Sequence, residues 1–204
     1  MDTSLFPTKG NLILAKNTLS LSIQGYELLD KKRNILIREM MTLIDRARAL
    51  QRQIEDTFTK AYQALQNANI VMGINHVQAL AESLPLEDSI QVYARSVMGT
   101  EIPMVSYQNK QLFPPYSFYT TTSALDEALI CFNEVKALSV TLAEVETAVY
   151  RLAVNIKKTQ KRANALKNVT IPRYRSLTKT IETSLEEKER EEFTRLKVIK
   201  KQMK

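Results

Sequence analysis

Apolar residues recur at every third and fourth position along two long segments, one near each end of the chain. The first stripe begins at Leu19 and ends at Ala68, and the second begins at Ala124 and ends at Thr170. This alternation is the a/d spacing of a coiled coil, in which the apolar positions of two helices meet along one seam. The pattern therefore predicts two long helices that pair with each other.

Most of the residues expected to fill the central part of this seam are large and aliphatic. In the first stripe they are Leu29, Leu36, Met40, Leu43, Leu50 and Ile54. In the second stripe they are Leu138, Leu142, Val145, Val149, Leu152 and Ile156. A helix of about 50 residues is roughly 75 Å long, which exceeds the width of a compact domain of this size. A coiled coil is therefore favoured over helices that lie on a globular core.

The heptad spacing is lost between residues 73 and 122. A short helix is expected over 75–83, and Ile90, Val92 and Ala94 then alternate with Gln91, Tyr93 and Arg95 in the manner of a strand. A second strand is expected over 103–107, with the turn at 98–101 and with Pro103 restricting that strand to a sheet edge. This segment predicts a small α+β head that contains a short β-hairpin.

The predicted fold is mainly α, a long antiparallel two-helix coiled-coil hairpin with the small head between its helices. We expect the N-terminal helix within 1–72, the head at 73–122 and the C-terminal helix within 123–204. Thr8 or Asn11 would cap the first helix, and Pro172 would kink the second because proline lacks a backbone N–H. If Ala68 faces Ala124, paired residue numbers sum to roughly 192 along an antiparallel seam.

Composition excludes several kinds of chemistry. The four glycines stand alone, so the chain has no Gly-rich loop that would cradle a phosphate. One histidine and one cysteine cannot build a His/Cys metal site or an internal disulfide. We therefore expect no catalytic residues, no cofactor and no metal. The N-terminus lacks an apolar signal segment, and no run reaches the ~20 apolar residues that cross a bilayer. We expect a soluble chain without direct membrane insertion.

The chain is basic, with a formal net charge of +7 and a pI near 9.4. This charge indicates an acidic partner and leaves open a basic helical arm that grips nucleic acid, for which Lys157, Lys158, Lys161 and Arg162 are the candidates. Against a nucleic-acid partner, the basic residues are interspersed with Asp and Glu, and no aromatic residues accompany this stretch of the helix for base stacking. A generic coiled-coil tether would also explain the periodicity.

Three segments carry a resemblance to a known family. Near the start stand Pro7-Thr8-Lys9-Gly10-Asn11-Leu12 and then Gly25-Tyr26-Glu27-Leu28-Leu29, followed by Lys31-Lys32-Arg33. Near the end stand Arg162-Ala163-Asn164-Ala165-Leu166, Ile171-Pro172 and the run from Leu185 to Lys197 that reads LEEKEREEFTRLK. In this order and spacing they resemble the D subunit of the V-type (vacuolar and archaeal-type) rotary ATPases. The resemblance covers nearly the whole chain, although the middle segment matches only in size and position.

The resemblance implies a non-catalytic central shaft inside a ring of catalytic (A) and regulatory (B) subunits. Rotation of the shaft would couple ATP hydrolysis or synthesis to proton or sodium ion transport. The small F subunit of the stalk and a funnel-shaped subunit (C/d type) would bind the shaft, and no nucleic acid would. The complex would be cytoplasmic and peripheral to the membrane. The residues expected to contact the ring lie at both chain ends: Pro7, Lys9, Gly10, Lys32, Arg33, Glu189, Arg190, Glu192, Arg195 and Lys197.

Overall fold

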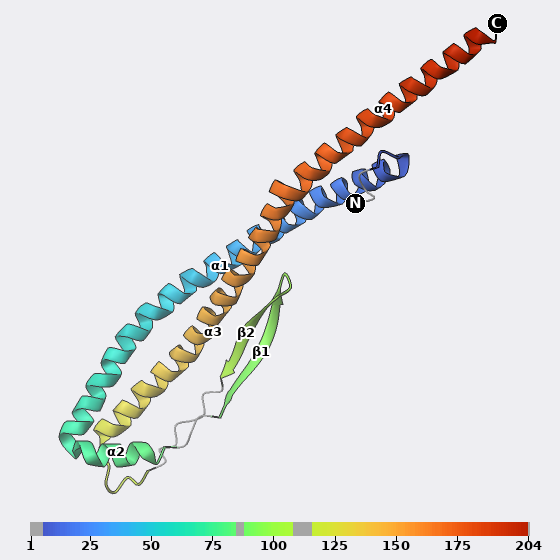
Figure 1. The fold of residues 1–204 in the computed structure, drawn as a ribbon. Helices are drawn as coiled ribbons and strands as arrows, with labels where there is room; N and C mark the ends of the chain where they lie inside the picture. Colours follow the sequence, from blue (N-terminus) through green and yellow to red (C-terminus); the bar gives the residue numbers. More distant parts are fainter. Residues whose placement is uncertain (1–5, 85–87, 108–115, 204) are drawn as a thin grey trace. The chain divides into compact units, whose positions relative to one another are not determined.

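Helices make up most of the protein (Figure 1). The computed structural model describes residues 6–84, 88–107 and 116–203. Along the chain it contains α1 (Lys9–Met72), α2 (Ile74–Glu82), β1 (Ile90–Val97), β2 (Thr100–Tyr107), α3 (Ser123–Ala165), the π-helical turn η2 (Leu166–Thr170) and α4 (Ile171–Gln202). The predicted fold class is confirmed, because a long N-terminal helix and a long C-terminal helix flank a short antiparallel β-hairpin.

The chain forms two compact units. The terminal unit comprises Met1–Ile35 and Ile156–Lys204, and the central unit comprises Leu36–Asn155. The terminal unit therefore contains the start of α1 together with the end of α3, η2 and α4. The central unit contains the rest of α1, the hairpin, α2 and most of α3.

The contacts between α1 and the C-terminal helices are antiparallel within each unit. In the terminal unit Arg33 contacts Gln160, and in the central unit Gln51 contacts Glu146. Each pair lies within two helical turns of the register predicted from the apolar stripes. The apolar periodicity, together with the head that connects the two stripes, thus predicted the antiparallel direction and an alignment close to the observed one.

The seam residues lie on the covered side of the helices. Four of them are buried: Leu36, Ile54, Val145 and Leu152. The others are half-buried: Leu29, Met40, Leu43, Leu50, Leu138, Leu142, Val149 and Ile156. Small residues such as Ala61 and Ala68 are buried near the end of α1, where they let the partner helix approach closely.

Glycine ends α1. Gly73 has φ +86°, in the left-handed region where residues with a Cβ are strained, and its N–H donates to the carbonyl of Asn69 over 3.0 Å. The chain then turns into α2, whose Val77 packs with Ala68 of α1 and Leu125 of α3 in a small apolar core. This core joins three helices of the central unit.

The β-hairpin has a tighter turn than the sequence predicted. Val97 pairs with Thr100, so the turn consists of Met98 and Gly99 rather than 98–101, and β2 begins at Thr100. Both turn residues have positive φ, 49° and 74°, as a type I′ turn requires. This turn type matches the twist of the strands, and pairing can therefore continue to the two residues that flank it.

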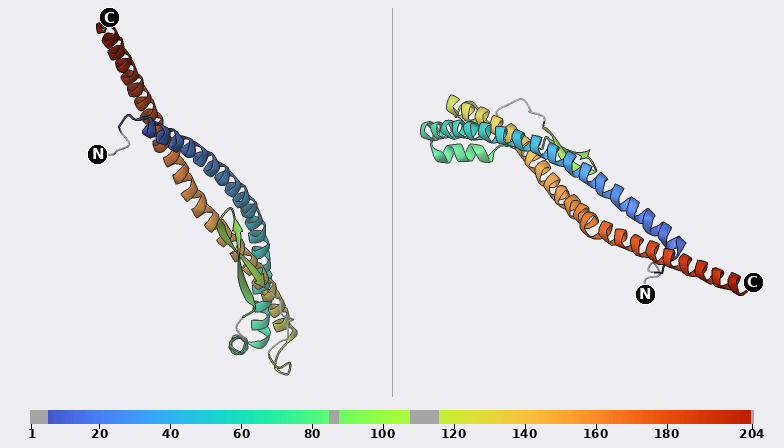
Figure 2. Two further views of the ribbon diagram at one scale, coloured as in Figure 1. Left: turned by 90° about the vertical axis from the view of Figure 1, so that its right-hand side faces the viewer. Right: turned by 90° about the horizontal axis from the view of Figure 1, so that it is seen from above.

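The outer edge of β2 is bonded to α3, beside which the hairpin lies (Figures 1 and 2). Pairs in an antiparallel ladder alternate between bonded and non-bonded positions, and Pro103 and Val105 both fall at non-bonded ones. The N–H of Val105 therefore points away from β1 and donates to Glu144 over 2.8 Å. Arg151 donates to the carbonyl of Glu101 over 3.3 Å. The missing N–H of Pro103 thus removes no bond from the ladder.

The irregularity in the C-terminal helix lies before the proline expected to cause it. The sequence predicted a kink near Pro172; the structure has the π-helical turn of η2 directly before it, and Pro172 follows in the first turn of α4. A proline in a regular helix clashes with the carbonyl four residues earlier, which here belongs to Asn168 of η2. Because the wide turn repositions this carbonyl, the chain stays helical through the proline.

Candidate functional site in the terminal unit

The conspicuous Pro7–Asn11 segment builds the start of α1. The backbone N–H of Asn11 donates to Oγ1 of Thr8 over 3.2 Å, so Thr8 caps the helix as predicted. The side-chain amide of Asn11 donates to the carbonyl of Phe6 over 2.9 Å. Gly10 faces open space, since an added Cβ would meet nothing within 4 Å. The motif therefore fixes the first turn and leaves the backbone at Gly10 accessible.

Two ion pairs join the start of α1 to α4. Lys9 Nζ lies 3.0 Å from Glu189 Oε1, and Lys16 Nζ lies 2.6 Å from Glu182 Oε1. The Lys9 and Glu189 side chains are 79% and 62% exposed, so water screens their attraction. Two residues expected to contact the ring are thus brought together, and the pair stays accessible to a partner.

The two inner motifs of the resemblance meet each other. A Cβ added to Gly25 would lie 3.7 Å from Cδ1 of Leu166, which is an ordinary van der Waals separation. Lys167 Nζ lies 5.8 Å from the centre of the Tyr26 ring, within the range of a cation–π contact. Tyr26 and Lys167 were not among the expected site residues. The antiparallel register would have pointed to them, because it places residues 25 and 26 opposite 166 and 167.

Arg33 occupies a seam position and finds its partners within the chain. One guanidinium nitrogen lies 2.6 Å from Asp30, and another donates to Gln160 over 2.8 Å. A second contact of the first nitrogen reaches Asn34 at 3.3 Å. These bonds explain how a charge is accommodated in an apolar stripe. The neighbouring Lys32 is half-buried.

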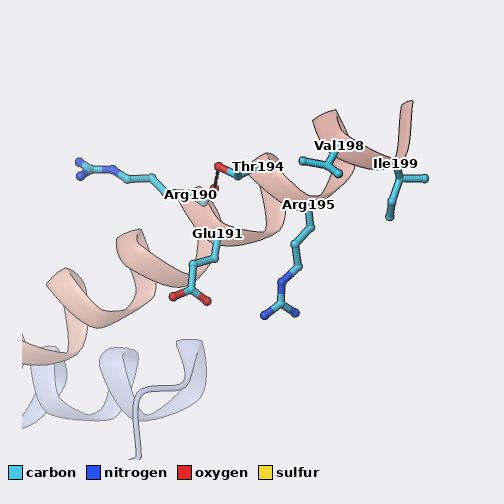
Figure 3. A pocket seen from close by; sticks show the side chains of 6 residues that line it. All are labelled: Arg190, Glu191, Thr194, Arg195, Val198 and Ile199. Atoms are coloured by element: carbon cyan, nitrogen blue, oxygen red, sulfur yellow. Dashed lines mark hydrogen bonds between the residues drawn. The ribbon is translucent and has the colours of Figure 1, made fainter. Parts of the chain in front are cut away.

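The last part of α4 extends past the start of α1, as the register predicts (Figure 1). Its side chains are exposed on all sides from Glu186 to Met203. Figure 3 shows Glu191 and Arg195 directed to the same side of the helix and Arg190 directed away from them. Here the charges alternate with exposed large apolar residues: Phe193, Leu196, Val198, Ile199 and Met203. Such a helix end offers a partner both charge and apolar area.

Within the described part of the chain, the other α4 residues expected to contact the ring interact only with side chains of α4 itself or are exposed. Arg190 lies 3.8 Å from Glu186, and Lys197 Nζ lies 4.7 Å from the centre of the Phe193 ring. Glu192 and Arg195 are exposed. The structure thus pairs Lys9 with Glu189. The expected contact residues after Glu189 lie on the exposed end of α4, where no other helix of the described residues packs against them.

The central unit contains an apolar pocket of about 240 Å³ between α1, α2 and α3. Tyr116 lies at its wall and donates a hydrogen bond to Asp126 over 2.7 Å. Burial raises the pKa of Tyr116 to about 12, and the hydrogen bond and the negative charge of Asp126 add to the effect. A neutral tyrosine among aliphatic side chains provides packing rather than a nucleophile or a general base.

The described residues contain neither a cluster of metal ligands nor a helix that could span a membrane. Across 6–84, 88–107 and 116–203, no three His, Cys, Asp or Glu side chains are grouped so as to hold a metal ion. His76 lies 3.2 Å from the carbonyl of Thr120, and Cys131 is a free, half-buried thiol. In the described part of the chain, no helix has the apolar length needed to span a membrane.

Two long helical segments that pair antiparallel, with a short β-hairpin between them in the sequence, define the chain as a helical coiled-coil protein. The chain belongs to the ATP synthase D-subunit family, whose model matches residues 11–201. It is 42% identical over 200 residues to the V-type ATP synthase D subunit of Thermotoga neapolitana, with 98% of each chain covered.

Archaeal relatives extend the comparison. The chain is 36% identical over 197 residues to the A-type ATP synthase D subunit of Pyrococcus furiosus, with 95% of this chain and 92% of that one covered. It is also 36% identical over 197 residues to that of Methanobrevibacter smithii, with 95% and 85% covered. These matches confirm the family resemblance, and the protein is a subunit of a rotary ATP synthase complex.

Proposed function

We propose that this chain is the non-catalytic central shaft of a V-type ATPase or ATP synthase. Its paired helices would turn inside a ring of A and B subunits and couple ATP hydrolysis or synthesis to proton or sodium ion transport. The observation that carries the proposal is the terminal unit, where α1 and α4 pair and α4 then continues alone with exposed charged and apolar side chains.

Paired helices suit the transmission of torque. A single helix twists and bends easily, whereas two helices locked along a continuous apolar seam resist relative sliding. The buried Leu36 and Leu152 and the Arg33–Gln160 bond hold the pairing at separate points along the chain. A pair of helices is asymmetric, so it would also present a different face to each catalytic site of a ring. One shaft could in this way put the sites into different states.

Most of the proposed ring contacts are exposed, whereas Pro7, Lys32 and Arg33 are half-buried. The full set is Pro7, Lys9, Gly10, Lys32, Arg33, Glu189, Arg190, Glu192, Arg195 and Lys197. Among them Arg33 already has three bonds within the chain. We therefore assign Arg33 to positioning of the pair and expect the direct contacts from the more exposed residues of this set.

The other partners are proposed from the same role. The F subunit would bind along the middle of the two paired helices, and the funnel subunit (C/d type) would receive the end that carries α2. The complex would be peripheral to the cytoplasmic face of the membrane. Neither nucleic acid nor the bilayer core would be a partner.

Native mass spectrometry of the complex that co-purifies with the tagged chain, after nuclease treatment, tests this proposal. The expected result is one copy of the chain with three copies of each of two large subunits, together with magnesium-dependent ATPase activity. A complex that nuclease dissolves, or a homo-oligomer of the chain alone, would overturn the shaft assignment.

A further inference from the structure

The positive charge of this protein is concentrated in one short part of the terminal unit. Between Ile156 and Ile181 the sequence contains eight basic residues and no Asp or Glu. The whole chain has 29 Lys and Arg against 22 Asp and Glu, so the remainder is close to neutral. We call this segment the cationic band; its basic residues are Lys157, Lys158, Lys161, Arg162, Lys167, Arg173, Arg175 and Lys179. The interspersion of acids that characterises the rest of the chain does not hold here.

All eight basic side chains of the cationic band are exposed. On α3, Thr159 and Ala163 are buried against α1, and a period of 3.6 residues places Lys157 and Lys161 on the opposite side of the helix. Within the described residues, none of the eight forms a salt bridge, although Lys167 lies over Tyr26. From Lys157 to Lys179 the band is about 35 Å long, at 1.5 Å for each residue.

This arrangement is unfavourable for a helix in isolation. Lys157 and Lys161, Lys158 and Arg162, and Arg175 and Lys179 are like charges four residues apart, a spacing that destabilises a helix. Elsewhere the chain uses opposite charges at this spacing, as in Glu186 and Arg190. A surface that keeps its charges unbalanced in the free chain is suited to a partner that supplies the opposite sign.

The opposite helix adds to the charge. The part of α1 opposite the band, residues 11–36, contains four basic residues (Lys16, Lys31, Lys32 and Arg33) and two acidic ones (Glu27 and Asp30), and Asp30 is bound by Arg33. Six acidic residues then follow the band between Glu182 and Glu192. These would repel a nucleic acid that lay along the helix, and the tyrosine of the band, Tyr174, is half-buried rather than free for stacking.

We propose that the cationic band is a docking surface for an acidic protein surface on the large subunits of the ATPase ring. This inference rests on the proposed shaft function. Because the energy between charges changes gradually with distance, such a contact tolerates rotation better than interlocked apolar side chains do. The band would hold the shaft in the ring while it turns.

Two variants of equal charge test this proposal in the full-length chain. The band variant carries Lys157→Gln, Lys161→Gln and Arg173→Gln. The control variant carries Arg46→Gln, Arg52→Gln and Lys60→Gln, three exposed basic residues of the central unit. Circular dichroism establishes that both fold. Binding to a ring assembled from the two purified large subunits is then measured by biolayer interferometry at 50, 150 and 500 mM salt.

The band variant is expected to bind the ring about tenfold more weakly at the lowest salt, and the difference should nearly vanish at the highest. The control variant should stay within about twofold of the wild type. Equal losses of ring affinity in both variants, or no loss in either, would overturn the band proposal. As long as the wild type binds the ring, the proposed shaft function would still hold. Failure of the wild type to bind the ring would instead overturn the proposed function.

A DNA duplex of random sequence provides the remaining comparison. If the band variant loses affinity for the duplex but keeps full affinity for the ring, the band serves nucleic acid and the proposal is wrong. If the wild type and both variants bind the duplex equally weakly at 150 mM salt, the result supports a protein as the partner of the band.

Discussion

The backbone N–H of Val105 donates to Oε2 of Glu144 over 2.8 Å, and this bond joins the outer edge of β2 to α3. An isolated two-stranded hairpin is barely stable in water, because too little of its surface is covered. Here the hairpin gains support from one strand edge, where Glu144, Arg151 and Asn155 of α3 reach β2. The opposite edge, on β1, carries mostly exposed side chains.

Replacement of Glu144 by alanine should loosen the hairpin without unfolding the helices. The Val105 amide would lose its acceptor, and its hydrogen exchange should become at least about tenfold faster, corresponding to the ~1.5–3 kcal/mol of a charged hydrogen bond. Hydrogen exchange measured by mass spectrometry on the peptide containing β2 checks this. Glu134→Ala on the exposed side of α3 is the control. Unchanged exchange in Glu144→Ala would mean that Arg151 and Asn155 suffice to hold the strand.

The pairing of the long helices was predictable because it follows from periodicity. A seam from Leu29 to Ile54 has enough repeats to fix a face, and the head between the stripes fixes the antiparallel direction. The start of α1 after the capping residue Thr8 and its end before Gly73 were also marked by residues with a clear local preference. These signals are local or periodic, which is the kind of information that a single sequence contains.

Other features depend on contacts that periodicity does not encode. A wide turn such as η2 leaves no mark in composition, and Pro172 indicated a disturbance without fixing where the backbone absorbs it. The hairpin turn was missed by two residues because Met98, which is not a glycine, adopts positive φ. The individual ion pairs of the site, such as Lys9 with Glu189, required a register accurate to one residue.

Gly25→Ala should stabilise the terminal unit. Glycine within a helix costs about 1 kcal/mol relative to alanine, and the added methyl group would sit 3.7 Å from Leu166 without a clash. We expect the melting temperature to rise by about 2–4 °C. Gly10→Ala, whose Cβ would face open space in the first helical turn, should change it less. A fall in melting temperature for Gly25→Ala would indicate that the helices need to approach more closely at this point.

Leu152→Ala should weaken the seam of the central unit. This side chain is fully buried, so truncation removes apolar contacts and leaves a cavity that costs about 3 kcal/mol. The midpoint of urea denaturation should fall accordingly. Val154→Ala on the same helix removes a side chain that is 41% exposed and should cost less than about 1 kcal/mol. Similar losses for the two variants would argue against a seam through residue 152.

Tyr116 should make the central unit sensitive to alkaline pH. The folded state raises the pKa of this hydroxyl from 10.0 to about 12, so the folded protein keeps the proton longer than the unfolded chain does. The stabilisation is therefore complete below pH 10 and is lost as pH rises through the folded pKa. After solvent screening of this partly exposed group, we expect a loss on the order of 1 kcal/mol.

Tyr116→Phe is the matched variant for this pH dependence. It removes the titrating hydroxyl and keeps the ring against Leu125 and the other pocket residues. The stability difference between wild type and variant, measured by urea denaturation from pH 8 to 11, should shrink as pH rises. A difference that stays constant over this range would show that the hydroxyl does not titrate differently in the two states.

The pair formed by Lys9 and Glu189 should matter more for assembly than for stability. Both side chains are largely exposed, so Lys9→Gln should change the free energy of unfolding by less than about 0.5 kcal/mol. If Lys9 contacts the ring, the same variant should bind the isolated ring several-fold more weakly. The control is Lys16→Gln, which removes a similar pair with Glu182 outside the proposed contacts.

Exchange of the charges in the double variant Lys9→Glu, Glu189→Lys separates the two roles. It restores the pair within the chain but presents the wrong sign at each position, so ring binding should remain weak while stability returns to the wild-type value. Recovery of ring binding by the exchanged pair would mean that Lys9 acts by holding α4 in place rather than by direct contact.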